Sequence, residues 1–316
     1  MRSFARAMRI VIPGGTGQIG GVLARAFRAA GHEVVILGRC SSGRPGVVAW
    51  DGRTVDAWAG ALDGAGAVIN LAGRSVNCRY SAANLEAMMS SRVDSTRAVG
   101  LAIEQAARPP RVWLQMSTAT IYAHRFDAPN DETTGLIGGE EPDAPGTWRL
   151  SIDIARAWER AMDEANTTRT RKIALRTAMV MSPDRGGIFD VLLRLTRWRL
   201  GGAIAGGAQF VSWIHERDFV RACEFLMARD DLAGPINIAA PEPLPHCDFM
   251  AALRAAWGAR LGLPAARWMV AIGAFFLPVR LCGLVPRSVR VVDGSSARRS
   301  WSESPSPRFD LNSVTR

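Results

Sequence analysis

The residues of this chain with the most informative spacing are glycines near its start. They lie in the segment Gly14-Gly15-Thr16-Gly17-Gln18-Ile19-Gly20, which fits the pattern G-x-G-x-x-G. Glycine adopts the positive φ of a tight turn and has no Cβ that would keep a phosphate away from the backbone. An apolar run, Ile10–Ile12, precedes the segment, and a helical pattern with an apolar face over Val22–Phe27 follows it. A strand, a glycine turn and a helix N-terminus in this order predict a site for the pyrophosphate of a dinucleotide rather than a plain structural turn.

The residue after the second predicted strand indicates which dinucleotide the site would take. This strand, His32–Leu37, is followed by Gly38-Arg39 and not by an acidic residue. An acid there would bind the ribose hydroxyls of NAD, whereas arginine can pair with the 2′-phosphate of NADP. Arg44 could assist. The sequence therefore predicts NADP, with NAD the less favoured cofactor and a merely solvated Arg39 as the alternative interpretation.

Two hydroxyl side chains follow the predicted strand Val112–Met116, at the edge of a sheet where ligands bind. Ser117 and Thr118 are candidate catalytic residues because a hydroxyl at this place could polarise a substrate carbonyl. In the alternative interpretation both hydroxyls bond to the backbone and cap the strand end. The residues alone leave both interpretations open.

Other side chains could take part in proton transfer or substrate binding. His124 and the pair Asp131-Glu132 lie in the loop expected beside the nicotinamide, and His215 lies in the second half of the chain. Each of these could equally be structural, and Arg79-Tyr80 could hold an anionic substrate or be solvated. The histidines and acids are not spaced as metal ligands, so no metal site is predicted.

Strand and helix patterns alternate from the N-terminus to Ala178. The predicted strands are Ile10–Ile12, His32–Leu37, Val47–Trp50, Ala67–Leu71, Val112–Met116 and Ile173–Ala178, and the predicted helices between them include Thr54–Leu62, Ala82–Ala107 and Ser151–Ala165. Repeated β-α order predicts an α/β fold with a Rossmann-like, doubly wound parallel sheet. The strand ends would then share one edge, where ligands bind.

The regular alternation of strand and helix patterns ends beyond Val180, where glycine-rich loops and prolines separate shorter elements. The patterns predict helices at Phe189–Trp198, Asp218–Ala228 and Cys247–Trp257, and a strand at Pro235–Ala239. We expect a dinucleotide-binding domain over residues 8–180, to which residues 208–238 contribute. Residues 181–207 and 239–300 would form a smaller, mixed α/β substrate lobe, and residues 301–316 a polar tail.

The composition argues against several other classes of protein. The net charge is +10, but Lys172 is the only lysine and the arginines are scattered, unlike the clustered basic face of a nucleic-acid binder. The five cysteines contain no C-x-x-C and are typical of reduced thiols in a cytoplasmic protein. The apolar stretch Trp268–Leu277 is too short for a membrane span and predicts a buried amphipathic helix. Residues 1–8 lack the features of a signal peptide, and translation could begin at Met1 or Met8.

Further segments carry a resemblance that spans nearly the whole chain. The chain resembles the extended short-chain dehydrogenase/reductases and, more narrowly, their NAD-dependent epimerase/dehydratase subfamily. The matching segments are Gly14–Gly20, Val68–Gly73, Ser91–Arg97, Met116–Tyr122, Trp158-Glu159, Leu175–Thr177, Val211–His215 with Asp218, and Gly234–Pro241. The resemblance implies a Rossmann-like core with a C-terminal substrate lobe. It also implies cofactor contacts from the glycine turn, Arg39, Asp51, Leu71, Ala72 and Gly73.

The chain departs from this superfamily at the catalytic pair Tyr-x-x-x-Lys, in which lysine lowers the pKa of the phenol. Its two tyrosines, Tyr80 and Tyr122, have no lysine four residues further on, and Lys172 begins a strand. Counting back from Trp158-Glu159 places Leu150 and Ile154 where the pair should stand. Tyr122 corresponds to a tyrosine that the family uses for packing. Ordinary Tyr/Lys chemistry is therefore excluded.

Two hypotheses of different class remain. The first is an NADP-dependent oxidoreductase or epimerase-like enzyme that exchanges hydride with a small carbonyl or hydroxyl substrate. The second is an NADP(H)-binding protein without turnover that regulates a partner, which the missing pair favours. A nucleic-acid-binding protein is a weaker third. We expect a small-molecule substrate, no nucleic-acid or membrane partner, and an architecture compatible with a homodimer.

Overall fold

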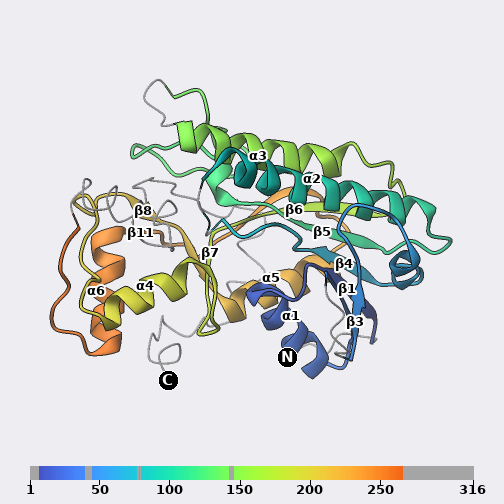
Figure 1. The fold of residues 1–316 in the computed structure, drawn as a ribbon, viewed down its shortest axis with the longest axis horizontal. Coiled ribbons are helices and arrows are strands. Elements are labelled where there is room, and N and C mark those ends of the chain that lie inside the picture. Colours follow the sequence, from blue (N-terminus) through green and yellow to red (C-terminus); the bar gives the residue numbers. More distant parts are fainter. Residues whose placement is uncertain (1–6, 40–44, 77, 79, 142–145, 266–316) are drawn as a thin grey trace.

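A seven-stranded parallel sheet runs through the computed structural model, which describes residues 7–39, 45–76, 78, 80–141 and 146–265 (Figure 1). The strand order is β10-β6-β5-β4-β1-β2-β3, and every pair is parallel. The strands are β1 (Arg9–Pro13), β2 (Glu33–Gly38), β3 (Val47–Ala49), β4 (Ala67–Asn70), β5 (Val112–Met116), β6 (Arg171–Thr177) and β10 (Gly234–Ile238). The predicted α/β fold with a Rossmann-like parallel sheet is confirmed.

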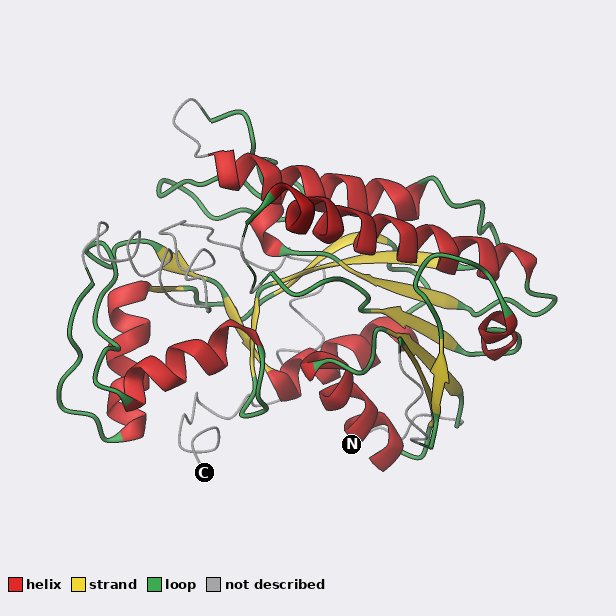
Figure 2. Ribbon diagram, viewed as in Figure 1, coloured by secondary structure: helices red, strands yellow, loops and turns green. Residues whose placement is uncertain are grey.

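Helices cover both faces of this sheet (Figure 2). The helices α2 (Ala82–Gln105) and α3 (Gly146–Asp163) pack together on one face. The helices α1 (Gln18–Ala29) and α5 (Glu216–Ala228) cover the other face. Because side chains alternate along a strand, Ile10 and Ile12 point to the α1 and α5 side while Val11 joins the opposite core.

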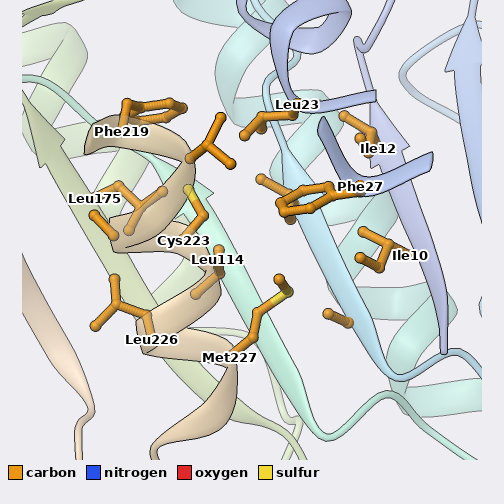
Figure 3. Close-up of a cluster of buried hydrophobic side chains, with 14 of the residues drawn as sticks. Ile10, Ile12, Leu23, Phe27, Leu114, Leu175, Phe219, Cys223, Leu226 and Met227 are labelled. Carbon is orange, nitrogen blue, oxygen red and sulfur yellow. The ribbon is translucent and has the colours of Figure 1, made fainter. Parts of the chain in front are cut away.

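The core on the α1 and α5 side is a continuous apolar cluster. Figure 3 shows Phe27 of α1 and Phe219 of α5 in this cluster, above the strands. Ile10, Ile12, Phe27 and Phe219 have no exposed surface. Burial of this kind fixes the height of α1 above the sheet, and with it the place where the glycine turn must reverse the chain.

The strand order reverses between β1 and β4, which lie side by side although β2 and β3 intervene in the sequence. Ligands bind at such a switch point, outside the carboxyl ends of the strands. Two backbone hydrogen bonds join the strand ends there: Leu71 N donates to Pro13 O (2.8 Å) and Gly14 N donates to Leu37 O (2.9 Å). The glycine turn therefore begins at the crevice that this topology creates.

A smaller unit lies beside the carboxyl edge of the sheet. It contains the helices α4 (Gly187–Arg197) and α6 (His246–Trp257), the antiparallel pair β8 (Phe210–Val211) and β11 (Leu244–Pro245), and the parallel pair β7 (Met179–Met181) and β9 (Trp213–His215). Its core holds Met181, Phe189, Phe249 and Leu253. The predicted helix at 268–277 and the polar tail at 301–316 lie outside the described residues.

Two predicted helices differ from the structure. The helix expected over Thr54–Leu62 is wrong, because a short 3₁₀ helix, η1 (Ala57–Ala61), replaces it. Asp51 holds the backbone at 53–54 in a turn, and Asp56 accepts a hydrogen bond from Ala57 N, so no regular helix can begin earlier. The helix α3 begins at Gly146, five residues before the predicted Ser151. Among the described residues no helix has the length and apolar character needed to cross a membrane.

Candidate functional site

Three glycines of the turn are required by the protein's own packing. Gly14 has φ +73°, and a Cβ there would lie 2.6 Å from Ala72 Cα. A Cβ on Gly15 would lie 2.8 Å from Ile12 O, and one on Gly20 would lie 2.3 Å from both Gly15 Cα and Gly15 O. The backbones of β1, the turn, the start of α1 and the segment after β4 therefore lie too close together at these positions to leave room for a side chain.

Gly17 differs, because the protein leaves space beside it. Its φ is −81°, and the only neighbour of a Cβ would be Gly14 O at 3.8 Å. Gly17 is the N-cap of α1, has no side-chain cap, and is followed by a first turn without acidic residues. The N–H groups of this first turn have no acceptor within the helix. Open space, free donors and the positive end of the helix dipole together fit a pyrophosphate.

The other residues of the turn contribute backbone groups and a contact with the smaller unit. Thr16 is exposed, and Gln18 and Ile19 are half-buried. The Gln18 side chain donates from Nε2 to Asp184 O (2.9 Å), and Arg25 pairs with the Asp184 carboxylate (2.5 Å). The loop before α4 is thereby held against the start of α1.

The predicted contacts Leu71, Ala72 and Gly73 form the opposite rim of the crevice. The buried side chain of Asn70 accepts a hydrogen bond from Ala72 N (3.1 Å) and donates to Gln115 Oε1 (3.0 Å). This side chain ties the segment to β5. A Cβ on Gly73 would lie 3.2 Å from the Arg92 side chain, so that side chain packs directly on the rim.

Arg39 and Asp51 lie at the ends of neighbouring strands. Arg39 is exposed directly after β2, and no acidic group pairs with it among the residues that the structure describes. Asp51 accepts hydrogen bonds from Thr54 N, Arg53 N and the Thr54 hydroxyl (2.9, 2.8 and 2.8 Å). These bonds, with Thr54 N first, hold the pKa of Asp51 below its ordinary value. The Asp51 carboxylate organises its own turn, and Arg44 lies outside the described residues.

The structure separates the two candidate hydroxyls. Ser117 is buried, and its Oγ donates to Glu159 Oε1 at 2.5 Å, which directs it into the protein. Thr118 is half-buried and caps the short helix η2 (Ala119–Ile121), where its Oγ1 accepts from Thr120 N (3.2 Å). Thr118 also lines a pocket. Of the two, Thr118 is placed to reach a ligand.

This pocket, of about 110 Å³, lies between the end of β5 and the helices α2 and α3. Its lining residues are Val76, Tyr80, Met88, Arg92, Thr118, Thr120, Leu150, Ser151, Ile154, Ala155 and Trp158. Leu150 and Ile154 lie in the lining, so the positions expected of the Tyr/Lys pair do face a cavity, with apolar side chains. Among the described residues of this lining, Arg92 is the only charged one.

A buried polar network lies behind the pocket and includes Ser117. Arg176 donates from Nε and Nη2 to the Glu159 carboxylate (3.0 and 2.8 Å) and from Nη1 to the Tyr122 hydroxyl (3.0 Å). That hydroxyl donates to Asn237 Oδ1 (2.8 Å). Burial disfavours the phenolate form of Tyr122. The pKa of Tyr122 is therefore raised, although its hydrogen bond with Arg176 acts in the opposite direction. Tyr122 has no exposed surface and is absent from the described lining of the pocket, so it is placed to pack rather than to touch a ligand.

None of the other proposed proton-transfer residues lines the pocket. The ring of His124 packs beside those of Phe126 and Trp148. Asp131 accepts from Thr133 N and Thr134 N, and Glu132 Oε1 accepts from Asn237 N (2.7 Å). His215 Nδ1 accepts from Arg217 N (3.1 Å) and so caps α5. Tyr80 does line the pocket, whereas Arg79 lies outside the described residues.

Sequence reasoning missed Arg92 as a site residue. Met88, Arg92, Ser95 and Val99 follow at helical spacing on α2, and Met88, Ser95 and Val99 are buried. This periodicity predicts that Arg92 faces inward, which is unusual for an arginine without an acid one turn away. This helical spacing is the sequence signal that indicates an inward-facing Arg92.

The chain's one lysine is placed far from the pocket. Lys172 stands beside Trp113 near the start of β6, at the amino end of the strand. Its Nζ donates to the carbonyl oxygens of Met162, Asp163 and Ala165 at the end of α3 (3.1, 2.9 and 3.1 Å). The prediction that Lys172 cannot serve the catalytic pair is confirmed.

The cap formed by His215 should make the stability of the fold depend on pH. Burial lowers the pKa of His215, so below about pH 6.5 the unfolded chain takes up a proton that the native chain does not. The free energy of unfolding should therefore fall with decreasing pH. His215→Asn keeps a capping acceptor and removes this proton, so it should flatten the slope between pH 6.5 and 5.5 by up to about 1.4 kcal/mol per pH unit. Urea unfolding at several pH values measures this, and an unchanged slope would contradict it.

Comparison with known proteins agrees with this architecture. The model of the NAD dependent epimerase/dehydratase family matches residues 10–239. Epimerase family protein SDR39U1 of Bos taurus is 31% identical over 263 residues, which cover 82% of each chain. Epimerase family protein Mb2239 of Mycobacterium bovis is 30% identical over 244 residues, 77% of each chain.

A solved structure is similar over almost the whole length. The crystal structure of human epimerase family protein SDR39U1 (isoform 2) with NADPH superposes with a TM-score of 0.81 at 26% identity, covering 98% of this chain and 99% of that one. The glycine turn, the strand order and the family match agree. The chain belongs to the NAD dependent epimerase/dehydratase family.

Proposed function

We propose that the protein binds NADP(H) and exchanges hydride between its nicotinamide and a small carbonyl or hydroxyl substrate. One observation carries the proposal: the turn after β1, the rim after β4 and Thr118 after β5 lie at the same edge of three neighbouring strands. A dinucleotide on the glycine turn would therefore extend toward the Thr118 pocket. The human relative of known structure was crystallised with NADPH, which supports the choice of cofactor.

Different residues of the site would bind the cofactor and position the substrate. The bound dinucleotide would supply or accept the hydride. Gly17 and the first turn of α1 would hold the pyrophosphate, and Arg39 the 2′-phosphate. Thr118 Oγ1 would donate a hydrogen bond to the substrate carbonyl, while Leu150 and Ile154 exclude water from it. The proton would come from a pocket hydroxyl or from water, since the usual pair is absent.

Binding and turnover can be tested separately. Purified protein is titrated with NADPH and NADH by fluorescence, and NADPH oxidation is then followed across a broad panel of carbonyl compounds. NADPH binding with turnover on some of the panel is the expected result. Binding without turnover would support the alternative, an NADP(H)-binding regulatory protein. Failure to bind either dinucleotide would contradict both functions.

Arg39→Asp should change the cofactor preference. Loss of a charge-assisted bond to the 2′-phosphate costs about 1.5–3 kcal/mol, so the Kd for NADPH should rise about 10- to 150-fold. The Kd for NADH should change little, because NADH has no phosphate there. Arg97→Asp is the matched control, with the same charge change at an exposed position of α2. Equal losses for the two dinucleotides would remove Arg39 from this role.

A further inference from the structure

Arg92 is an arginine in an apolar pocket. Its guanidinium stacks over the ring of Trp158, 5.0 Å from the ring centroid, and its aliphatic and guanidinium atoms pack on Gly73. The neighbouring lining residues are aliphatic, aromatic or hydroxyl side chains. Stacking on the indole fixes the plane of the guanidinium and directs its N–H groups along that plane.

Most N–H groups of the Arg92 side chain have no acceptor among the residues that the structure describes. A guanidinium has five N–H groups. One bond, from Nη1 to Met88 O (3.0 Å), is made within the described part of the chain, where no carboxylate pairs with Arg92. Burial lowers the pKa of Arg92 to about 10, so the group is still protonated at neutral pH. A desolvated cation without an anion is costly to the fold.

A comparison with Arg176 shows which partner Arg92 lacks among the described residues, namely a carboxylate for its guanidinium group. Arg176 is buried on the side of the sheet where Arg92 is half-buried, and it is paired in bidentate fashion with Glu159. Arg92 has no such partner among the described residues, and it lines the Thr118 pocket, whose described lining does not include Arg176. A planar anion in the cavity would complete the same arrangement for Arg92.

We propose that Arg92 anchors the substrate, and that the substrate is a small carboxylic acid bearing a carbonyl or hydroxyl group. This inference rests on the proposed function, since it names the substrate class of the same pocket. The carboxylate would accept from the free guanidinium N–H groups. The carbonyl or hydroxyl group would lie toward Thr118, which lines the same pocket. A cavity of about 110 Å³ with apolar walls favours a short acid over a sugar nucleotide.

The test is calorimetric and needs no turnover. Protein saturated with NADP⁺ is titrated with 2-oxo acids of three to six carbons, with the methyl esters of the same acids, and with inorganic phosphate. We expect at least one acid to bind, its ester to bind about 10-fold or more weakly, and Arg92→Met to lose about the same factor. Arg92→Lys should retain part of the affinity, and Arg97→Met, exposed on the same helix, should retain all of it.

The contrary outcomes are distinct. If no acid binds, if esters bind as well as acids, or if phosphate binds more tightly than every acid, the substrate class is wrong. If Arg92→Met or Arg92→Lys weakens NADP⁺ binding as much as acid binding, Arg92 belongs to the cofactor site instead. Failure of the wild-type protein to bind NADP⁺ or NADPH would instead overturn the proposed function, and it is seen before any acid is added.

Discussion

Gly20→Ala is expected to weaken NADPH binding more than about 100-fold. The new Cβ would lie 2.3 Å from Gly15 Cα and Gly15 O, and neither backbone atom can move without displacing the turn. Overpacking of this kind costs about 1–3 kcal/mol of stability. In the proposed site, displacement of the turn would also remove at least two hydrogen bonds to the pyrophosphate, each worth about 1.5–3 kcal/mol, so the Kd for NADPH should rise more than about 100-fold. Urea unfolding and fluorescence titration measure the two effects.

Two neighbouring variants separate packing from ligand contact. Gly17→Ala has room in the protein, so the unfolding free energy should fall by less than about 1 kcal/mol while the Kd for NADPH rises about 10-fold or more. Gly21→Ala meets only Arg25 Nη1 at 3.5 Å and should leave binding unchanged, with a small gain in helix stability. Wild-type NADPH affinity in Gly17→Ala would show that the pyrophosphate does not approach this turn.

Glu159→Ala should cost more stability than the glycine-turn variants. It leaves the Arg176 guanidinium buried without its bidentate partner, which costs about 3–5 kcal/mol. In the wild-type protein burial disfavours the Arg176 cation, and its hydrogen bonds to Glu159 more than offset this and raise its pKa; the variant loses that compensation. The Ser117 hydroxyl loses its acceptor as well. Urea unfolding of the purified variant measures the loss.

The matched comparison is an exposed ion pair on the same sheet. Glu33→Gln removes the partner of Arg9 at the surface and should cost less than about 1 kcal/mol. The double variant Glu159→Leu with Arg176→Met should recover part of the loss, because it removes both buried charges. Equal, small losses in Glu159→Ala and Glu33→Gln would mean that the buried pair does not stabilise the fold.

The sequence predicted the sheet well because its strands are buried on both faces. Such strands appear as short apolar runs, as in Ile10–Ile12 and Ala67–Leu71, and the glycine turn fixes where the first one ends. Helix faces such as that of α1 repeat every three or four residues, and this periodicity does not depend on distant contacts. Local sequence patterns were therefore sufficient to predict the parallel sheet and the glycine turn after its first strand.

The rest depended on contacts between residues far apart in the chain. Ser117 and Thr118 are alike in sequence, and Glu159, 42 residues away from Ser117, decides which hydroxyl is buried. The paired strands β7 and β9 have three residues each, which is too short for a periodic pattern to mark them. In the sequence β7 precedes α4 and β9 follows it, so their pairing is a contact between distant segments. The pocket is assembled from two helices and two loops, and only their packing shows that Arg92 faces Trp158.

The position of Lys172 has a chemical consequence. Its ammonium fastens the last carbonyls of α3 at the amino end of β6, and no other side chain of the protein carries a primary amine. No Schiff base with a lysine can therefore form in the pocket. Acylation by an amine-directed reagent has only this side chain and the chain terminus to modify. A fluorophore attached at Lys172 would replace the hydrogen bonds of its ammonium and would lie at the amino end of β6, away from the Thr118 pocket.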